Sequence, residues 1–194
     1  MEPKIGYASL RRYRVTLPGA CYFLTICTDR RKPGLTAPKI ADAIARELQR
    51  LDEDMKTISS DGFQSTPRAQ ARWPTKSDAI APFLRAWVIM PDHVHVFFRA
   101  NEKLSVGQVV GRLKTKTTAA LQTKKLRWQT NYYERRLRFD DPVEDMLRYM
   151  FLNPYRANLA KTNERYPLFW ICSDDAEWFE PKLSDNRPFP EWLD

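Results

Sequence analysis

Apolar positions recur along the chain with two periods, one typical of strands and the other of helices. Apolar and β-branched runs predict strands over residues 20–27, 83–90 and 93–99, and aromatic residues indicate a fourth strand over 132–137. Pro91 and Asp92 separate the second and third runs and predict a tight turn between them.

Helical spacing fills the intervals between these strands. Apolar residues three and four apart predict one helix over Ile40 to Met55, with Thr36 and Pro38 as start signals, and another from Val106 to Leu121. Ser105 is the expected N-cap of the second helix. Residues 57–80 contain Gly, Pro and Ser with little periodicity, which predicts a long loop.

The resulting order is β-α-β-β-α-β, which is that of a ferredoxin-like antiparallel sheet in the α+β class. It predicts two helices on one face of the sheet, with the other face free. The length fits one domain over residues 1–172. Residues 173–194 are acidic and are interpreted as a C-terminal tail, either a disordered extension or a cover for a basic surface.

A third helix is predicted after residue 140. Asp141 is placed as N-cap, Pro142 at the first helical position and Glu144 in a capping box, while Pro154 is expected to end or kink the helix. Tyr149 and Asn153 are i and i+4, so they share one face. On this pattern alone, Tyr149 is more simply a partly buried tyrosine of the core.

The two histidines of the chain, His93 and His95, stand two residues apart in a predicted strand. Side chains at i and i+2 point to the same side of a sheet, so two imidazoles lie next to each other. Neutral imidazole is a common metal ligand. Metal binding and a coincidental pair on a solvated face both fit this segment.

The charge is unevenly distributed. The chain has 32 Lys and Arg against 24 Asp and Glu, a net charge of +8, and a pI near 9.5. Basic residues gather in 1–36 and 103–139, which favours nucleic acid as partner and an anionic membrane surface second. No apolar run is long enough to span a membrane and no signal peptide is expected. Three cysteines without a CxxC pair indicate reduced thiols and a cytoplasmic location.

Two motifs in this order resemble a known family. Pro91-Asp92-His93-Val94-His95 and the later Tyr149-Met150-Phe151-Leu152-Asn153-Pro154-Tyr155-Arg156-Ala157-Asn158-Leu159 resemble the single-tyrosine HUH transposases, in particular the REP-associated tyrosine transposases. Trp128-Gln129 before Tyr132 or Tyr133, and Arg11-Arg12 before Leu17-Pro18-Gly19, add to a resemblance that runs over residues 10–160. The chain has Asn158 where the family usually has Gly.

The resemblance implies an HUH endonuclease fold with an added C-terminal helix that carries the nucleophile. Tyr149 matches the nucleophilic tyrosine, His93 and His95 match the metal ligands, and Asn153 matches the residue that completes the metal site. Mg²⁺ or Mn²⁺ is the implied cofactor. The implied activity is DNA transposition and recombination, in which a single strand is cut and rejoined beside a short hairpin through a 5′-phosphotyrosine.

The implied partner is single-stranded or hairpin DNA, with no membrane, and the protein is expected to associate with the nucleoid when bound. Both a monomer and a homodimer are compatible with the sequence. Combining the resemblance with the basic tracts, the candidate DNA contacts are Arg11, Arg12, Arg14, Arg112, Lys114, Lys116, Arg127, Trp128, Arg135, Arg136 and Arg156.

Other phosphoryl-transfer classes fit less well. A histidine-triad hydrolase needs a third alternating histidine, but position 97 is Phe, and paired two-histidine phosphoesterases need a second motif. A structural zinc site would need cysteine or histidine partners near the pair. The remaining alternative is a catalytically silent protein that binds DNA or RNA hairpins with the same fold.

Overall fold

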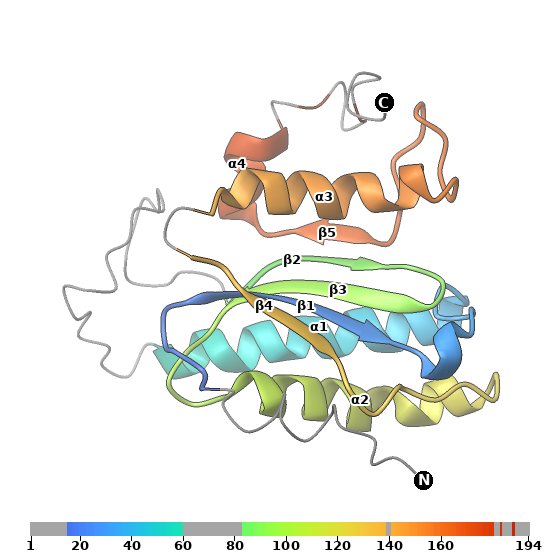
Figure 1. Cartoon of the computed structure of the whole chain (residues 1–194), viewed down its shortest axis with the longest axis horizontal. Coiled ribbons are helices and arrows are strands. Elements are labelled where there is room, and N and C mark those ends of the chain that lie inside the picture. The colour runs from blue at the N-terminus through green and yellow to red at the C-terminus, as the bar shows by residue number, and fades with distance from the viewer. Residues whose placement is uncertain (1–14, 60–82, 139–140, 181–182, 184–187, 189–194) are drawn as a thin grey trace, which may run out of the picture.

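The protein folds around a single five-stranded antiparallel sheet, seen in a computed structural model that describes residues 15–59, 83–138, 141–180, 183 and 188. The strand order is β4-β1-β3-β2-β5. Figure 1 shows this sheet between two layers of helices. The elements are β1 Cys21–Cys27, η2 Asp29–Arg31, α1 Pro38–Ser59, β2 Leu84–Ile89, β3 His93–Arg99, α2 Val106–Gln122, β4 Tyr133–Arg136, α3 Val143–Arg156, β5 Phe169–Ile171 and α4 Ser173–Phe179.

The first four strands and two helices confirm the predicted ferredoxin-like order. The tight turn at Pro91 and Asp92 joins β2 to β3, as the sequence indicated. Ser105 is the N-cap of α2: its Oγ accepts from the N–H of Gln108 at 3.3 Å, while Gln108 Oε1 accepts from the N–H of Ser105 at 2.8 Å. α1 extends to Ser59, so the first residues of the predicted loop are helical, and residues 60–82 lie outside the described part.

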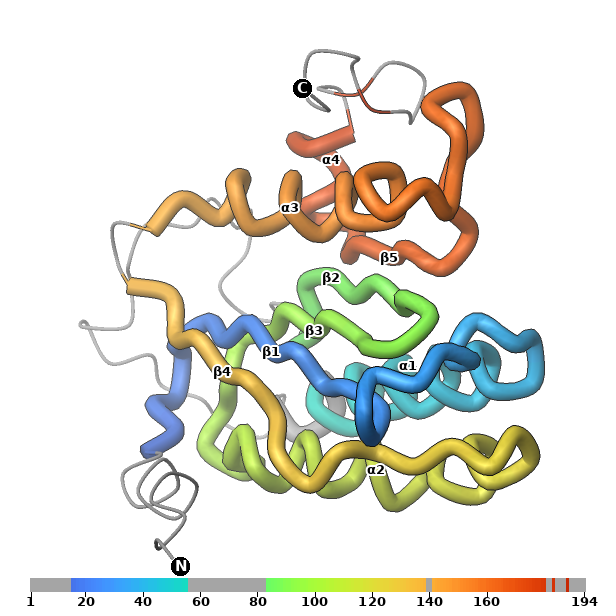
Figure 2. Tube along the Cα trace, turned by 45° about the vertical axis from the view of Figure 1, so that its right-hand side comes forward, coloured from blue at the N-terminus to red at the C-terminus, as the bar shows by residue number. Residues whose placement is uncertain are grey.

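One face of the sheet is covered by α1 and α2 (Figure 2). The even-numbered residues of β1 and β3, such as Leu24, Ile26, Val94 and Val96, join the apolar stripes of the two helices in a first core. This alternation leaves the odd-numbered residues of β3 on the opposite face. His93 and His95 therefore point away from α1 and α2.

The opposite face is not free, in contrast to the prediction, because α3 and α4 cover part of it (Figure 1). Leu147, Met150 and Phe151 of α3 are buried against this face in a second core. The ring of Phe151 packs against Phe169 of β5 and Phe179 of α4, with centroids 5.3 and 5.9 Å away. A fifth strand and a fourth helix, absent from the sequence prediction, thus hold α3 on the sheet.

The start and end of α3 differ from the prediction. Asp141 does not cap the helix: its Oδ2 accepts from the N–H of Arg138 at 3.0 Å and pairs with Arg135 at 3.1 Å. The N-cap is Pro142, which makes no side-chain cap bond. Pro154 lies inside the helix, which ends at Arg156. The prediction was wrong because the carboxylate of Asp141 is occupied by Arg135 of β4 and by the N–H of Arg138 just after that strand.

The first part of the predicted acidic tail is an integral element of the domain. Asp175 of α4 is buried and receives two hydrogen bonds from Arg85, one of 2.5 Å from Nε and a second from Nη2. Arg85 occupies a β-bulge in β2, since Leu84 pairs with Phe98 while Ala86 pairs with Phe97. This buried bidentate ion pair joins α4 to the sheet. A boundary at residue 172 therefore cuts through packed structure.

Candidate active site

The two histidines lie side by side on the sheet face that α3 crosses. β3 pairs with β1 so that His95 is opposite Thr25 and His93 is opposite Cys27. Both imidazoles are buried, with His93 8% and His95 3% exposed. The two side chains lie on the same side of the sheet, as the strand alternation predicted. The alternative interpretation, a coincidental pair on a solvated face, is wrong.

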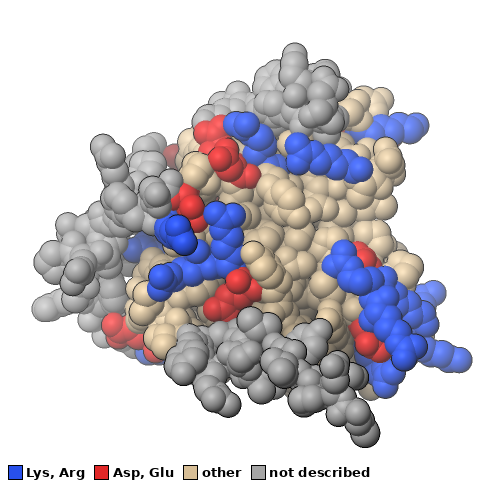
Figure 3. Space-filling model, in the orientation of Figure 1, with Lys and Arg blue, Asp and Glu red and all other residues tan. Residues whose placement is uncertain are grey.

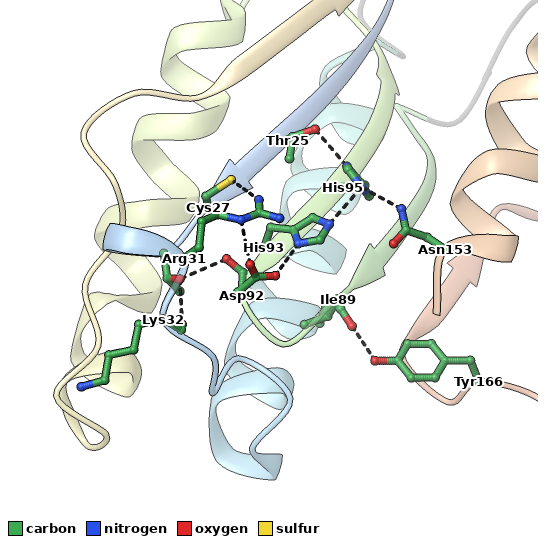
Figure 4. A network of polar contacts seen from close by, with 11 residues as sticks. Thr25, Cys27, Arg31, Lys32, Ile89, Asp92, His93, His95, Asn153 and Tyr166 are labelled. Atoms are coloured by element: carbon green, nitrogen blue, oxygen red, sulfur yellow. Dashed lines mark hydrogen bonds and ion pairs between the residues drawn. The ribbon is translucent and has the colours of Figure 1, made fainter. Parts of the chain in front are cut away.

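His95 is held by contacts from two elements. Its Nδ1 lies 3.0 Å from Oγ1 of Thr25, and its ring stacks on Phe23 with centroids 4.9 Å apart. On its other side, Nε2 lies 3.2 Å from the side-chain amide of Asn153 on α3. These contacts fix the orientation of the ring, with Nε2 directed towards the gap between the sheet and α3 (Figure 4).

His93 is oriented by a carboxylate. Oδ1 of Asp92 lies 2.6 Å from Nδ1 of His93, and Oδ2 pairs with Nε of Arg31 at 2.7 Å. Arg31 also donates from Nη1 to the sulfur of Cys27 at 2.8 Å. Figure 4 shows this chain from Cys27 through Arg31 and Asp92 to the imidazole. A carboxylate that accepts from Nδ1–H leaves the lone pair of His93 on Nε2.

Three polar side chains converge on one point. Nε2 of His93 lies 3.1 Å from Nε2 of His95, which in turn lies 3.2 Å from the amide of Asn153. Adjacent ligands of an octahedral ion with bonds of about 2.1 Å are about 3.0 Å apart. The separations therefore fit two cis ligands of one cation, and the Asn153 amide can turn its oxygen towards it.

The donor set restricts the kind of metal. Among the described residues there is no cluster of three or more His, Cys, Asp or Glu side chains that could hold an ion. Asn153 is the further polar side chain beside the pair, and a cation held by these three groups would keep the remaining positions of an octahedral shell open to water or phosphate oxygens. A site with few protein donors and an open shell is typical of Mg²⁺ or Mn²⁺. A structural zinc site has four protein ligands in a closed tetrahedron.

Both rings are neutral at neutral pH. Burial, helped by the neighbouring His93, lowers the pKa of His95 to about 3. Burial also lowers the pKa of His93, although the carboxylate of Asp92 opposes this. A neutral imidazole has a lone pair to give to a metal, whereas an imidazolium has none. The environment of the pair thus favours the ligand-competent form.

Tyr149 lies one turn before Asn153 on the same face of α3. Its ring meets the edge of His95 and of Phe23, with centroids 5.5 and 5.9 Å away. The side chain is 43% exposed and belongs to neither core, so the interpretation as a core tyrosine is wrong. A phenol that is open to solvent and adjoins the histidine pair is accessible to a bound phosphodiester.

The predicted DNA contacts on and near α2 are not part of this site. Arg112 pairs with Glu47 at 2.8 Å and with Asp54 at 2.7 Å on α1. Lys114 donates to the backbone oxygens of residues 129–131. Trp128 donates from its indole to Thr117 at 2.9 Å and packs on the first core. Contacts within the protein occupy these three side chains, on the far face of the sheet.

The remaining candidates are dispersed. Arg135 is opposite Phe23 in the β1–β4 register and so faces the site side, where it pairs with Asp141, while Arg136 points to the other face. Lys116, Arg127 and Arg156 are exposed, on α2, after α2 and at the end of α3. Arg11, Arg12 and Arg14 lie outside the described residues.

Sequence reasoning missed the residues that position the histidines. Strand pairing brings Phe23 and Thr25 of β1 beside β3. Arg31 comes from η2, the turn after β1, and reaches the site through its ion pair with Asp92. Asp92 had a usable signal, because a carboxylate directly before a candidate ligand is a natural partner for its ring.

Comparisons with known proteins concern the family and the fold of the chain. Residues 75–144 match the family model described as Transposase IS200 like, which confirms over that region the resemblance seen in the sequence. The match includes His93 and His95 and ends before Tyr149. No curated protein matches the chain. None of the described helices has the length and apolar character needed to cross a membrane.

The fold is shared with a solved structure described as a REP-associated tyrosine transposase bound to a REP hairpin. The two chains are 20% identical, the similarity covers 82% of this chain and 79% of the other, and the TM-score is 0.55. The ferredoxin-like sheet with additional helices is therefore the fold that this chain has in common with that transposase.

Proposed function

We propose that the protein is a metal-dependent transposase that cuts and rejoins single-stranded DNA through Tyr149. The observation that carries this proposal is the position of Tyr149, whose ring contacts His95 while Asn153 on the next helical turn contacts the same imidazole. One helix face therefore presents a nucleophile and a polar ligand together to a buried pair of neutral histidines.

The proposed reaction is a transesterification. The phenolic oxygen of Tyr149 attacks the phosphorus of a phosphodiester, and the bond from phosphorus to the 3′ oxygen breaks. The phenol loses its proton and the leaving oxygen gains one, so a 5′-phosphotyrosine and a free 3′-OH result. Attack by another 3′-OH reverses the step and rejoins the strand. The number of phosphate ester bonds is conserved, so no nucleotide triphosphate is consumed.

His93, His95 and Asn153 would hold Mg²⁺ or Mn²⁺, which when bound polarises the phosphoryl group and offsets the charge that develops on it. The protein contributes orientation. Thr25 holds the ring of His95, and Asp92 holds that of His93, with Arg31 fixing the carboxylate. Such supporting contacts keep ligands close to their working geometry before a substrate arrives.

The proposed substrate is a short DNA hairpin with an adjacent single strand. The hairpin in the solved structure of similar fold supports this substrate, as does the net charge of +8. Tyr149 contacts the histidine of its own chain, so we propose that a monomer contains one complete site. Action on DNA implies a cytoplasmic, nucleoid-associated protein.

The test uses labelled hairpin oligonucleotides with single-stranded flanks, incubated with Mg²⁺, Mn²⁺ or EDTA and separated on denaturing gels. We expect a metal-dependent band of DNA linked to protein, absent from Tyr149→Phe. Tyr133→Phe is the matched control, because Tyr133 is an exposed tyrosine on the same side of the sheet, opposite Thr25. A covalent band that persists in Tyr149→Phe would exclude this nucleophile.

The alternative function is a silent protein that binds DNA or RNA hairpins. It predicts retarded but uncut hairpins in native gels for the wild type and for Tyr149→Phe alike. The buried, oriented histidine pair favours the enzyme, since a binder gains nothing from placing two desolvated imidazoles nitrogen to nitrogen.

A further inference from the structure

A cluster of exposed cations lies at the end of the sheet where β3 begins. It is formed by η2 and by the turn that follows α2, and Figure 3 shows Lys and Arg gathered there, at the lower right. The N–H of Asp29 donates to the carbonyl of Arg127 at 2.7 Å, which holds the two turns side by side. The η2–α2 patch comprises Arg30, Lys32, Lys124, Lys125 and Arg127.

The positive charge of the η2–α2 patch is poorly compensated. Asp29 is its acidic neighbour and lies 3.8 Å from Arg127. Within the described part of the chain, Arg30, Lys32, Lys124 and Lys125 form no ion pair. Crowded like charges repel one another, and an anion brought among them relieves that repulsion.

The backbone of the η2–α2 patch is also unusual. Four non-glycine residues among those described have a positive φ, of 55° at Arg30, Lys125 and Asn158 and 57° at Arg31. Three of these four are basic and belong to the two turns of the patch. Side chains with a Cβ disfavour this conformation, and its occurrence points to a role in function.

The ends of α2 and α3 allow a direct comparison. After α2, Leu126 N–H bonds to Leu121 O and Lys125 N–H to Gln122 O; after α3, Leu159 N–H bonds to Pro154 O and Asn158 N–H to Tyr155 O. Both helices therefore end in the same Schellman motif. After α3 the left-handed position is occupied by Asn158, a residue type that tolerates this conformation. After α2 it is occupied by Lys125, which has no such tolerance.

The η2–α2 patch adjoins the active site. Cys27, the last residue of β1, is opposite His93, and the N–H of Thr28 donates to the carbonyl of Asp92 at 2.9 Å. The turn of η2 begins at the next residue. A DNA strand whose phosphate lies at the histidine pair therefore has this patch beside it.

We propose that the η2–α2 patch binds the backbone phosphates of the single strand that continues from the cleavage site. This inference rests on the proposed function and extends it, since it assigns a path to the flanking strand. The contacts are ionic and independent of base sequence. They would hold the strand while the covalent link waits for the second 3′-OH.

The first test removes charge from the patch and measures binding in the Tyr149→Phe background, so that its result does not depend on cleavage. Arg30, Lys32 and Lys124 are changed together to Gln, and the control changes Arg46, Arg50 and Lys103, which are exposed cations on α1 and before α2. Each phosphate contact to a single strand contributes about 0.7 to the slope of log K against log salt concentration, and so raises the affinity about fourfold at 0.15 M salt. We expect the slope to fall by about 2 and binding to weaken about 60-fold.

The control variant should bind within about twofold of its parent, although it loses the same charge. Equal weakening in both variants would show a general charge effect and overturn the proposal. Trimming the flanks of the oligonucleotide identifies the bound segment. On removal of one flank, the parent should lose affinity and the patch variant should not. If the patch variant is equally weakened on a hairpin without flanks, the cations hold the stem instead.

The second test separates binding from folding. Lys125→Gly relieves the left-handed strain and removes one patch cation, while Asn158→Gly makes the same backbone change outside the patch. Lys125→Gly should melt at an unchanged or higher temperature and bind about fourfold more weakly. Asn158→Gly should leave binding unchanged. Unaltered binding by Lys125→Gly would remove Lys125 from the patch. Absence of a covalent product in the cleavage assay would refute the proposed function while leaving these binding results interpretable.

Discussion

The support of His93 by Asp92 gives a quantitative prediction for metal binding. Asp92→Asn keeps the shape of the side chain but replaces the charged acceptor that lies 2.6 Å from Nδ1. The amide can present its NH₂ to the ring, which favours the wrong tautomer, and it no longer holds Arg31 through an ion pair. We expect Nε2 of His93 to become a poorer and less well oriented ligand.

The magnitude follows from comparable outer-sphere partners. Loss of a carboxylate behind a ligating histidine weakens metal binding about 10- to 100-fold, or about 1.4 to 2.8 kcal/mol. Asp92 is 22% exposed, so solvent screens part of its charge and the lower half of this range is the better expectation. The fold should be kept, since Asp92 lies in a turn and the strand pairing of β3 does not depend on its side chain.

Mn²⁺ titration followed by calorimetry or by the loss of the free-ion electron paramagnetic resonance signal measures this effect without DNA. Asp29→Asn is the control, because it removes a nearby exposed carboxylate whose only ion pair among the described residues is with Arg127 at 3.8 Å. It should leave the affinity within about twofold. An Asp92→Asn affinity equal to that of the wild type would refute the argument that this carboxylate orients His93.

Three further perturbations have defined outcomes. Asn153→Asp should retain Mn²⁺ binding and Asn153→Leu should weaken it, because an oxygen is required there; equal binding by both would exclude Asn153 as a ligand. Below pH 6.5 the metal-free protein should lose up to about 1.4 kcal/mol of unfolding free energy per pH unit, since unfolded His95 takes up a proton that the folded ring, with a pKa of about 3, refuses. Urea titrations at pH 7 and pH 5 should show a smaller difference for His95→Gln than for the wild type, and an unchanged difference would contradict the burial argument. Asp175→Asn should cost about 3 to 5 kcal/mol in urea unfolding because Arg85 is left buried and unpaired, while Asp174→Asn should cost less than about 1 kcal/mol; similar losses would show that the pair does not anchor α4.

Local patterns predicted those parts of the fold and site that depend on local order. Strand alternation placed His93 and His95 on one face, and helical spacing placed Tyr149 and Asn153 one turn apart. No periodicity in the sequence relates α3 to β3. Only the family resemblance implied that the face of α3 with Tyr149 meets the face of β3 with the histidines.

Contacts between distant segments were beyond such patterns. Thr25 meets His95 through 70 residues of sequence separation, and Arg85 meets Asp175 through 90. The segment that forms α4 was interpreted as part of an acidic tail because acidic residues dominate its composition. The burial of Asp175 is explained only by its pairing with Arg85 at the bulge of β2. The failed cap at Asp141 has a local cause instead, since Arg135 and Arg138, six and three residues away, compete for its carboxylate.

The packing of Phe151 against β5 and α4 limits how α3, the helix that carries Tyr149, can be exchanged between proteins. Phe151 stands two residues after Tyr149 and is held by Phe169 and Phe179, which lie beyond the end of the family match. A chimera that transplants residues 143–156 alone would lose Phe169 and Phe179, whose packing against Phe151 positions α3, and with it Tyr149, over the histidines. The transferable module extends from Val143 to Phe179, and the recipient sheet must supply a partner for Asp175, as Arg85 does here.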